Sequence, residues 1–132
     1  MIRFGTDGWR GRIGREFTFE RVRTASQAFA AFLSKHHPRK GTLVVGYDRR
    51  FLADQFAKSA SEVLVGNGFK VLFFSKPVPT PLVSFAVLQK KALGGVVLTA
   101  SHNPAEFLGM KLKDATGASY DAMGTDAVER FL

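Results

Sequence analysis

The segment from Thr99 to Pro104 (TASHNP) holds the residues of this chain with the clearest chemical potential. Ser101 closely follows an apolar run, and Pro104 restricts the conformations of the loop behind it. Ser101 is therefore a candidate nucleophile, and the alternative is a turn serine that caps its own backbone. Side chains of neighbours in an extended loop point apart, so we expect His102 to contact or orient a phosphate rather than to form a dyad with Ser101. The alternative for His102 is a loop histidine without a chemical role.

Several basic residues could hold an anion near such a nucleophile: Arg10, Arg49, Arg50, Lys111 and Lys113. Taken singly, each of these side chains could be an ordinary basic residue that lies in solvent at the protein surface. Lys111 and Lys113 share one face of an expected strand, which is also how a solvated edge is protected against pairing. Asp7 and Asp48 could orient the basic groups or cap turns. No Asp-x-Asp pattern occurs in the sequence, so we expect no complete metal site within this chain.

The elements that would position these residues alternate between strands and helices. Short, nearly continuous apolar runs at 43–45, 71–74 and 96–98 are typical of strands that are covered on both faces. Helical spacing is found at 19–33, at 56–64 and at about 121–132. A further helix is predicted to begin at Pro81, with Thr80 as its cap. The order predicts a three-layer α/β/α fold with a mainly parallel, mixed sheet. Residues 110–113 alternate apolar and basic side chains, which favours an antiparallel edge strand.

Ligands of open α/β sheets bind beyond the carboxyl ends of the strands. Three polar clusters follow the expected strands at that edge, at 46–50, 77–81 and 99–104. The glycine-rich stretch 5–11 is predicted to be a loop that allows close backbone approach, and it joins the other three clusters only if the fold brings it there.

Length and composition fit one globular domain over residues 1–132, and the uncapped last pattern suggests that the chain stops in or just after a helix. Apolar residues make up 45% and charged residues 23%, and there is no cysteine.

No apolar run is long enough for a membrane span or a signal peptide, so we expect a cytoplasmic protein with no membrane partner. The net charge of +8 favours anionic ligands, either nucleic acid or a phosphorylated small molecule. No nucleic-acid-binding motif accompanies the charge, so we expect no nucleic-acid partner.

Two segments resemble the α-D-phosphohexomutases, of the phosphoglucomutase and phosphomannomutase type. Residues 4–11 (FGTDGWRG) resemble the N-terminal signature of that family, and TASHNP resembles its phosphoserine loop. The family's Gly-x-Asp-x-Arg element matches Gly46–Arg50, and Pro79–Pro81 matches a further shared segment. The likeness runs from about Ile2 to Thr116, and it identifies the chain as the N-terminal domain, domain I, of such an enzyme.

The resemblance implies that Ser101 carries a phosphate and exchanges it with a hexose phosphate, reversibly between C1 and C6, through a hexose 1,6-bisphosphate. It also implies catalytic roles for Arg10, His102 and Lys111. Phosphate or substrate contacts are expected from Thr99, Asn103 and Arg50. A Mg²⁺ ion would take the phosphate of Ser101 as one ligand, and its remaining ligands would come from outside this chain. A phosphoserine carries nearly two negative charges and needs such cationic neighbours.

Two departures from the family pattern matter. Leu108 stands where the family usually has an asparagine in Asn-Gly-x-Lys, which removes a polar turn residue before Lys111. Family members also have four domains, so the remaining domains of the same polypeptide are expected partners and the isolated chain is expected to be inactive. The alternative is a non-catalytic module that binds phosphosugars or other anions.

Overall fold

A single five-stranded mixed sheet forms the centre of the computed structural model, which describes residues 1–5 and 7–132. Thr6, a member of the FGTDGWRG segment, lies outside the described residues. The strands are β1 (Trp9–Arg12), β2 (Thr42–Tyr47), β3 (Lys70–Phe73), β4 (Gly94–Leu98) and β5 (Phe107–Lys113), and their order in the sheet is β1-β5-β4-β2-β3. β2 pairs in parallel with β3 and β4, whereas β5 is antiparallel to β4 and β1. The α/β class and the mixed sheet are as predicted.

The edges of the sheet differ from the prediction. The 110–113 strand is antiparallel, but it lies inside the sheet between β4 and β1. The edge position belongs to β1, which overlaps the stretch 5–11 that was predicted to be a glycine-rich loop. β3 forms the opposite edge and is only partly buried, although its apolar run predicted a strand covered on both faces. Composition alone did not reveal these positions because pairing order is decided by tertiary packing.

In the described part of the chain, four helices accompany the strands: α1 (Phe19–His36), α2 (Ala53–Gly66), α3 (Thr80–Gln89) and α4 (Ala122–Glu129). Thr18 caps α1 by accepting a hydrogen bond from the Arg21 amide, and Asp121 caps α4 through the Gly124 amide. α3 begins one residue earlier than predicted, because Pro79 occupies the capping position and Thr80 is already helical.

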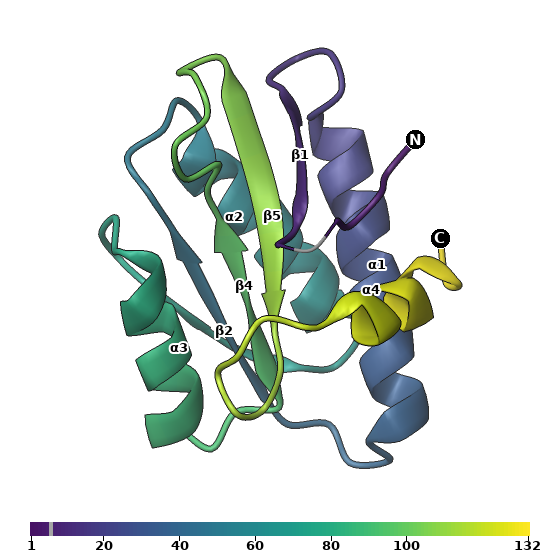
Figure 1. Ribbon diagram of the computed structural model, residues 1–132. Helices are drawn as coiled ribbons and strands as arrows, with labels where there is room; N and C mark the ends of the chain where they lie inside the picture. The colour runs from purple at the N-terminus through teal and green to yellow at the C-terminus, as the bar shows by residue number, and fades with distance from the viewer. Residues whose placement is uncertain (6) are drawn as a thin grey trace.

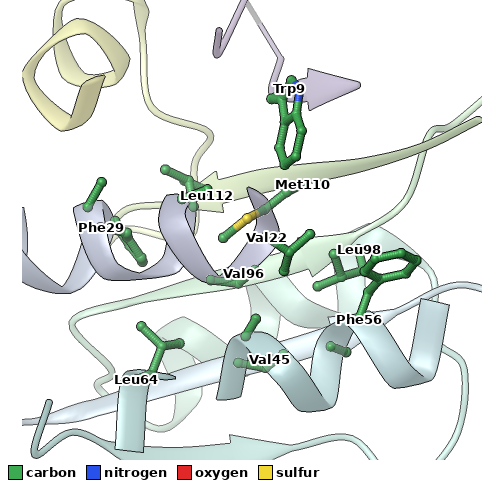
Figure 2. Close-up of a cluster of buried hydrophobic side chains, with 14 of the residues drawn as sticks. Trp9, Val22, Phe29, Val45, Phe56, Leu64, Val96, Leu98, Met110 and Leu112 are labelled. Atoms are coloured by element: carbon green, nitrogen blue, oxygen red, sulfur yellow. The ribbon is translucent and has the colours of Figure 1, made fainter. Parts of the chain in front are cut away.

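The helices cover both faces of the sheet, which gives the predicted three layers (Figure 1). α1 and α2 pack together on one face, and α4 packs against α1. On that face, Met110 and Leu112 of β5 and Val96 and Leu98 of β4 lie beside Val22 of α1 (Figure 2).

α3 covers the other face, where its buried valines pack on Val44 and Val97. Since successive strand residues face opposite sides, Met110 and Leu112 point to the α1 side and Lys111 and Lys113 point to the α3 side.

Leu108, which replaces the usual family asparagine, is a strand residue and not a turn residue. It lies in β5 and is completely buried in the main core. Burial of an asparagine side chain there would need hydrogen-bond partners, whereas leucine contributes apolar contacts. The leucine is thus explained by core packing, and Lys111 keeps its place three residues further along the strand.

Candidate active site

Ser101 lies in a turn three residues after the end of β4, at the carboxyl edge of the parallel strands. Its side chain is exposed, and its φ of 53° places it in the left-handed region. For a residue with a Cβ, the left-handed region costs about 1–2 kcal/mol of conformational free energy. Such conformations persist only where the surrounding structure holds them. The serine is therefore presented to solvent in a conformation that its neighbours enforce.

The position of His102 corrects one premise of the sequence interpretation. That interpretation assumes an extended loop, but the left-handed turn at Ser101 brings its Oγ within 3.5 Å of His102 Nδ1. That distance is at the outer limit for a hydrogen bond and longer than a well-formed serine–histidine pair requires. Both side chains are exposed.

Arg50 lies beneath the serine loop and binds it through the backbone. Its Nη2 donates to the carbonyl oxygens of Ser101 (2.8 Å) and Asn103 (2.6 Å). Its Nη1 donates to the carbonyl oxygens of Pro104 (2.8 Å) and Phe107 (3.0 Å). Arg50 and Ser101 thus share one edge of the sheet, as their places after two parallel strands predicted.

Thr99 and Asp48 complete this arrangement on the other side of the serine. The Thr99 hydroxyl donates to Asp48 Oδ2 at 2.6 Å and accepts a hydrogen bond from the Ser101 amide at 3.1 Å. Thr99 is buried, with 5% of its surface exposed. Asp48 also accepts a bond from the Arg50 amide and lies 3.5 Å from Arg50 Nε. Sequence reasoning considered Asp48 only as an orienting or turn residue and missed this link.

Asn103 is half-buried, and Arg50 holds its backbone carbonyl. Its side-chain oxygen is buried and has no hydrogen-bond partner among the described residues. A buried acceptor of this kind costs free energy unless a donor reaches it, so Asn103 offers an unused acceptor beside the serine loop.

A second group of charged residues gathers around Asp7 on the α3 side of the sheet. Lys111 Nζ donates to Asp7 Oδ2 at 2.6 Å, and Arg10 Nη2 lies 3.5 Å from the same oxygen. Lys113 Nζ donates to Ser119 Oγ at 3.0 Å, and that hydroxyl lies 3.4 Å from Asp7 Oδ1. The glycine-rich stretch therefore does join β5, but it meets the lysines and not the serine loop directly. No motif or spacing in the sequence indicated that Ser119 would join this group.

Burial and neighbouring charges shift the pKa values of two residues in this group, Asp7 and Lys113. Partial burial raises the pKa of Asp7, but the hydrogen bond from Lys111 and the charges of Lys111, Arg10 and Lys113 outweigh it, so the pKa lies below its ordinary value of 3.8. Burial lowers the pKa of Lys113, and the charge of Lys111 adds to that effect, while Asp7 and Asp114 oppose it.

Gly109 of β5 lies opposite Arg10 of β1 and leaves space for the Arg10 side chain. Arg10 pairs with Gly109 in the β1–β5 register, and a Cβ at Gly109 would meet Arg10 Cγ at 2.9 Å. The same Cβ would lie 2.7 Å from the Thr99 carbonyl oxygen and 2.8 Å from that of Trp9. Only glycine fits at this position, and its lack of a side chain leaves room for the Arg10 stem beside it.

The three polar clusters predicted at the strand ends do lie together. Arg49 and Pro77 line a hollow of about 310 Å³ with Asp48 and Arg50, and the neighbouring hollow of about 520 Å³ reaches Asn103. Volumes of this order suit small ligands.

Among residues 1–5 and 7–132, no group of three or more His, Cys, Asp or Glu side chains could hold a metal ion. Within the same residues, no helix combines the length and apolar character that crossing a membrane requires.

Comparison with known proteins decides the family. Residues 1–132 match the family described as "Phosphoglucomutase/phosphomannomutase, alpha/beta/alpha domain I". The chain belongs to this family. A phosphoribomutase of Saccharomyces cerevisiae is 38% identical over 88% of the chain, and a probable phosphoglucosamine mutase of Methanobrevibacter smithii is 36% identical over 96%. These alignments cover 20% and 27% of the two relatives, so the chain spans well under a third of their length.

Solved structures of the family agree with the fold. The structure named as a putative phosphomannomutase from Thermus thermophilus superposes with a TM-score of 0.94 at 50% identity, over 98% of this chain and 29% of that one. The phosphoglucomutase pp63/parafusin from Paramecium, in its open form, gives a TM-score of 0.88 at 26% identity, over 98% and 25%. The predicted relationship to the N-terminal domain of the phosphohexomutases is therefore confirmed.

Proposed function

We propose that this chain is the domain of a phosphohexomutase that carries the active-site serine, and that Ser101 relays phosphate between C1 and C6 of a hexose phosphate. The observation that carries the proposal is the presentation of Ser101, exposed at the carboxyl edge of the sheet in an enforced left-handed conformation. The chain belongs to a family whose relatives are named as phosphomutases, and this membership supports the reaction type.

In the proposed reaction, phosphorylated Ser101 meets a hexose monophosphate. A free sugar hydroxyl attacks the phosphorus and gives its proton to a base, the bond from Ser101 Oγ to phosphorus breaks, and the departing Oγ takes up that proton to become the serine hydroxyl. The product is a hexose 1,6-bisphosphate. After the sugar turns over, the Ser101 hydroxyl attacks the other phosphate and gives its proton to the base. The bond from that phosphorus to the sugar oxygen breaks, the sugar oxygen receives the proton, and the isomerised monophosphate leaves.

Such a transfer depends more on positioning and cations than on covalent machinery. We assign Arg10 to stabilising the phosphoserine, Lys111 to proton transfer and His102 to orienting the phosphate. We assign Asn103 to contacting the substrate, because it lines the hollow beside Arg50.

We assign Thr99 and Arg50, which were predicted to contact phosphate, to holding the loop, because their polar groups already bind Asp48 and the backbone.

Mg²⁺ would supply charge neutralisation for the phosphate. The described part of this chain has no cluster of metal-binding side chains, so its contribution would be one oxygen of phosphorylated Ser101. A cytoplasmic location likewise stays a prediction.

The test uses the longest natural polypeptide that contains this chain, incubated with glucose 1,6-bisphosphate and Mg²⁺. Intact-mass spectrometry should find one added phosphoryl group, which peptide mapping should place on Ser101. Ser101→Ala should remove it and lower turnover by about a thousandfold or more. Lys111→Ala should slow turnover but leave Ser101 able to carry phosphate. If Ser101→Ala turns over within about tenfold of wild type, the relay assignment is wrong.

The 132-residue polypeptide gives a second test. We expect it to show no conversion of glucose 1-phosphate to glucose 6-phosphate, even with Mg²⁺ and glucose 1,6-bisphosphate, because it offers no complete metal site in its described residues. Measurable conversion by the isolated chain would show that its own residues suffice, and would overturn the proposed dependence on further domains.

A further inference from the structure

Asp48 contacts both of the groups that hold the serine loop. It directly follows β2, and its two carboxylate oxygens point in two directions. Oδ1 accepts the Arg50 amide at 2.9 Å. Oδ2 accepts the Thr99 hydroxyl at 2.6 Å and lies 3.5 Å from Arg50 Nε.

Asp48 is linked to Ser101 by two chains of hydrogen bonds and ionic contacts, here called arms. The first arm runs through Thr99 to the amide of Ser101. An ionised carboxylate can only accept hydrogen bonds, so the Thr99 hydroxyl must direct its proton toward Asp48. That leaves the lone pairs of Thr99 Oγ1 for the Ser101 amide, at 3.1 Å. Asp48 thereby decides which way the buried hydroxyl points, and the hydroxyl anchors the N–H of the serine.

The second arm runs through Arg50 to the carbonyl of Ser101. A guanidinium has five N–H donors in a fixed fork, and here Nη1 and Nη2 use theirs on four backbone carbonyls. Nε faces Asp48, which sets the orientation of the planar group. A lysine ammonium has three donors and no plane, so it cannot reproduce this pattern.

The two arms meet at one strained residue. The N–H of Ser101 is held by Thr99 and its carbonyl oxygen by Arg50, so both backbone polar groups of the serine depend on Asp48. The φ of 53° at Ser101 needs such support, because a residue other than glycine leaves the left-handed region when its surroundings relax.

We propose that Asp48 is a positioning residue which, through Thr99 and Arg50, holds Ser101 in the left-handed conformation required for it to accept and return phosphate. The proposal rests on the phosphate relay proposed above, and it adds that aiming the serine is the task of a carboxylate that does not itself touch the phosphate. Asp48→Asn keeps the shape of the side chain but replaces one acceptor with a donor, so it cannot accept hydrogen bonds from both the Arg50 amide and the Thr99 hydroxyl.

The first measurement is made on the 132-residue chain and does not depend on catalysis. Amide hydrogen exchange of Ser101, followed by NMR, should be faster by about tenfold in Asp48→Asn and in Thr99→Val, because each loses a hydrogen bond that protects the turn. Thr99→Ser keeps the hydroxyl and should retain the wild-type rate. Asp126→Asn, an exposed carboxylate on α4, is the matched control and should also leave the rate unchanged.

The second measurement follows uptake of phosphate by Ser101 from glucose 1,6-bisphosphate in the longer polypeptide. Asp48→Asn, Thr99→Val and Arg50→Lys should slow it by about tenfold or more, while Thr99→Ser and Asp126→Asn should not. The effect should fall on the rate constant for transfer and not on the concentration for half-saturation, since Asp48 is assigned no contact with the sugar.

The two measurements separate the possible failures. If wild-type protein takes up no phosphate, the relay is wrong, and the exchange rates still decide whether Asp48 holds the turn. If wild type takes up phosphate but Asp48→Asn and Thr99→Val match it in both exchange and uptake, the positioning role is overturned. If Asp48→Asn fails to fold, the comparison of Thr99→Val with Thr99→Ser decides the question alone.

Discussion

Lys111 Nζ donates a hydrogen bond to Asp7 Oδ2 across 2.6 Å, which ties β5 to the loop before β1. The lysine side chain is 10% exposed and the aspartate side chain 46% exposed. Asp7→Asn would leave a mostly buried ammonium beside a neutral amide. We expect it to lower the free energy of unfolding by about 1–2 kcal/mol, less than a fully buried pair would lose because Asp7 is half in solvent.

Urea unfolding at neutral pH measures this loss. Glu62→Gln is the control, because it breaks the exposed ion pair between Arg23 and Glu62 and should change stability by less than about 0.5 kcal/mol. Equal effects of the two substitutions would contradict the importance of the Lys111–Asp7 pair.

The same pair makes stability depend on acid pH. The pKa of Asp7 is lower in the folded chain than its ordinary value of 3.8, so the unfolded chain binds more protons as the pH falls. The contribution of Asp7 is therefore complete above the unfolded pKa and is lost as the pH falls through the folded pKa. We expect the difference in urea midpoint between wild type and Asp7→Asn to shrink as the pH falls below the ordinary pKa of 3.8. A difference that stays constant as the pH falls would mean that the charge of Asp7 is not what stabilises the fold.

Lys113 is a buried amine whose bonded partner is the hydroxyl of Ser119. Burial lowers its pKa below 10.5, and the charge of Lys111 adds to that. Lys113→Met should therefore be neutral or should stabilise the chain by up to about 1 kcal/mol at neutral pH. Because the unfolded chain binds more protons between the folded pKa and 10.5, wild type gains stability as the pH rises there, so the advantage of Lys113→Met should diminish.

Thermal unfolding across alkaline pH checks this expectation. Lys58→Met, at an exposed position of α2, serves as the control and should show no such pH dependence relative to wild type. A clear destabilisation by Lys113→Met would show instead that the ammonium is needed to hold Ser119 and Asp7 in place.

Gly109 should tolerate no side chain. A Cβ there would lie 2.7 and 2.8 Å from two backbone oxygens, which cannot yield without moving a strand. We expect Gly109→Ala to cost about 2 kcal/mol or more. Gly66→Ala is the matched control, since nothing lies within 4 Å of a Cβ at this helical position, and it should stabilise α2 by about 0.5–1 kcal/mol. Chemical denaturation of both variants gives the comparison, and equal midpoints would contradict the close packing of β1 and β4 around β5.

The strain at Ser101 can be measured with two substitutions that both remove the hydroxyl. Ser101→Gly accepts a φ of 53° freely, whereas Ser101→Ala does not. We expect the glycine variant to be more stable than the alanine variant by about 1 kcal/mol. An alanine variant as stable as the glycine variant would mean that the turn is not strained.

Local patterns determined much of this protein before any tertiary contact was known. Apolar runs indicated β2 and β4 because strands buried on both faces need continuous apolar side chains, and three-to-four spacing indicated α1 and α2 because a helix buries one face. Ser101 and Arg50 could be assigned to one edge because parallel strands end on the same side of a sheet. The order of the FGTDGWRG and TASHNP segments sufficed to indicate the family.

Only the tertiary structure decided how the site is held. The turn at Ser101, the use of Arg50 on four backbone carbonyls and the central place of Asp48 depend on partners about 50 residues apart, such as the Asp48–Thr99 pair at a separation of 51. The edge position of β1 and the burial of Leu108 likewise depend on which strands pair. Hydrogen-bond partners at such separations leave no periodic signal, because the spacing between them is set by the folded path of the chain.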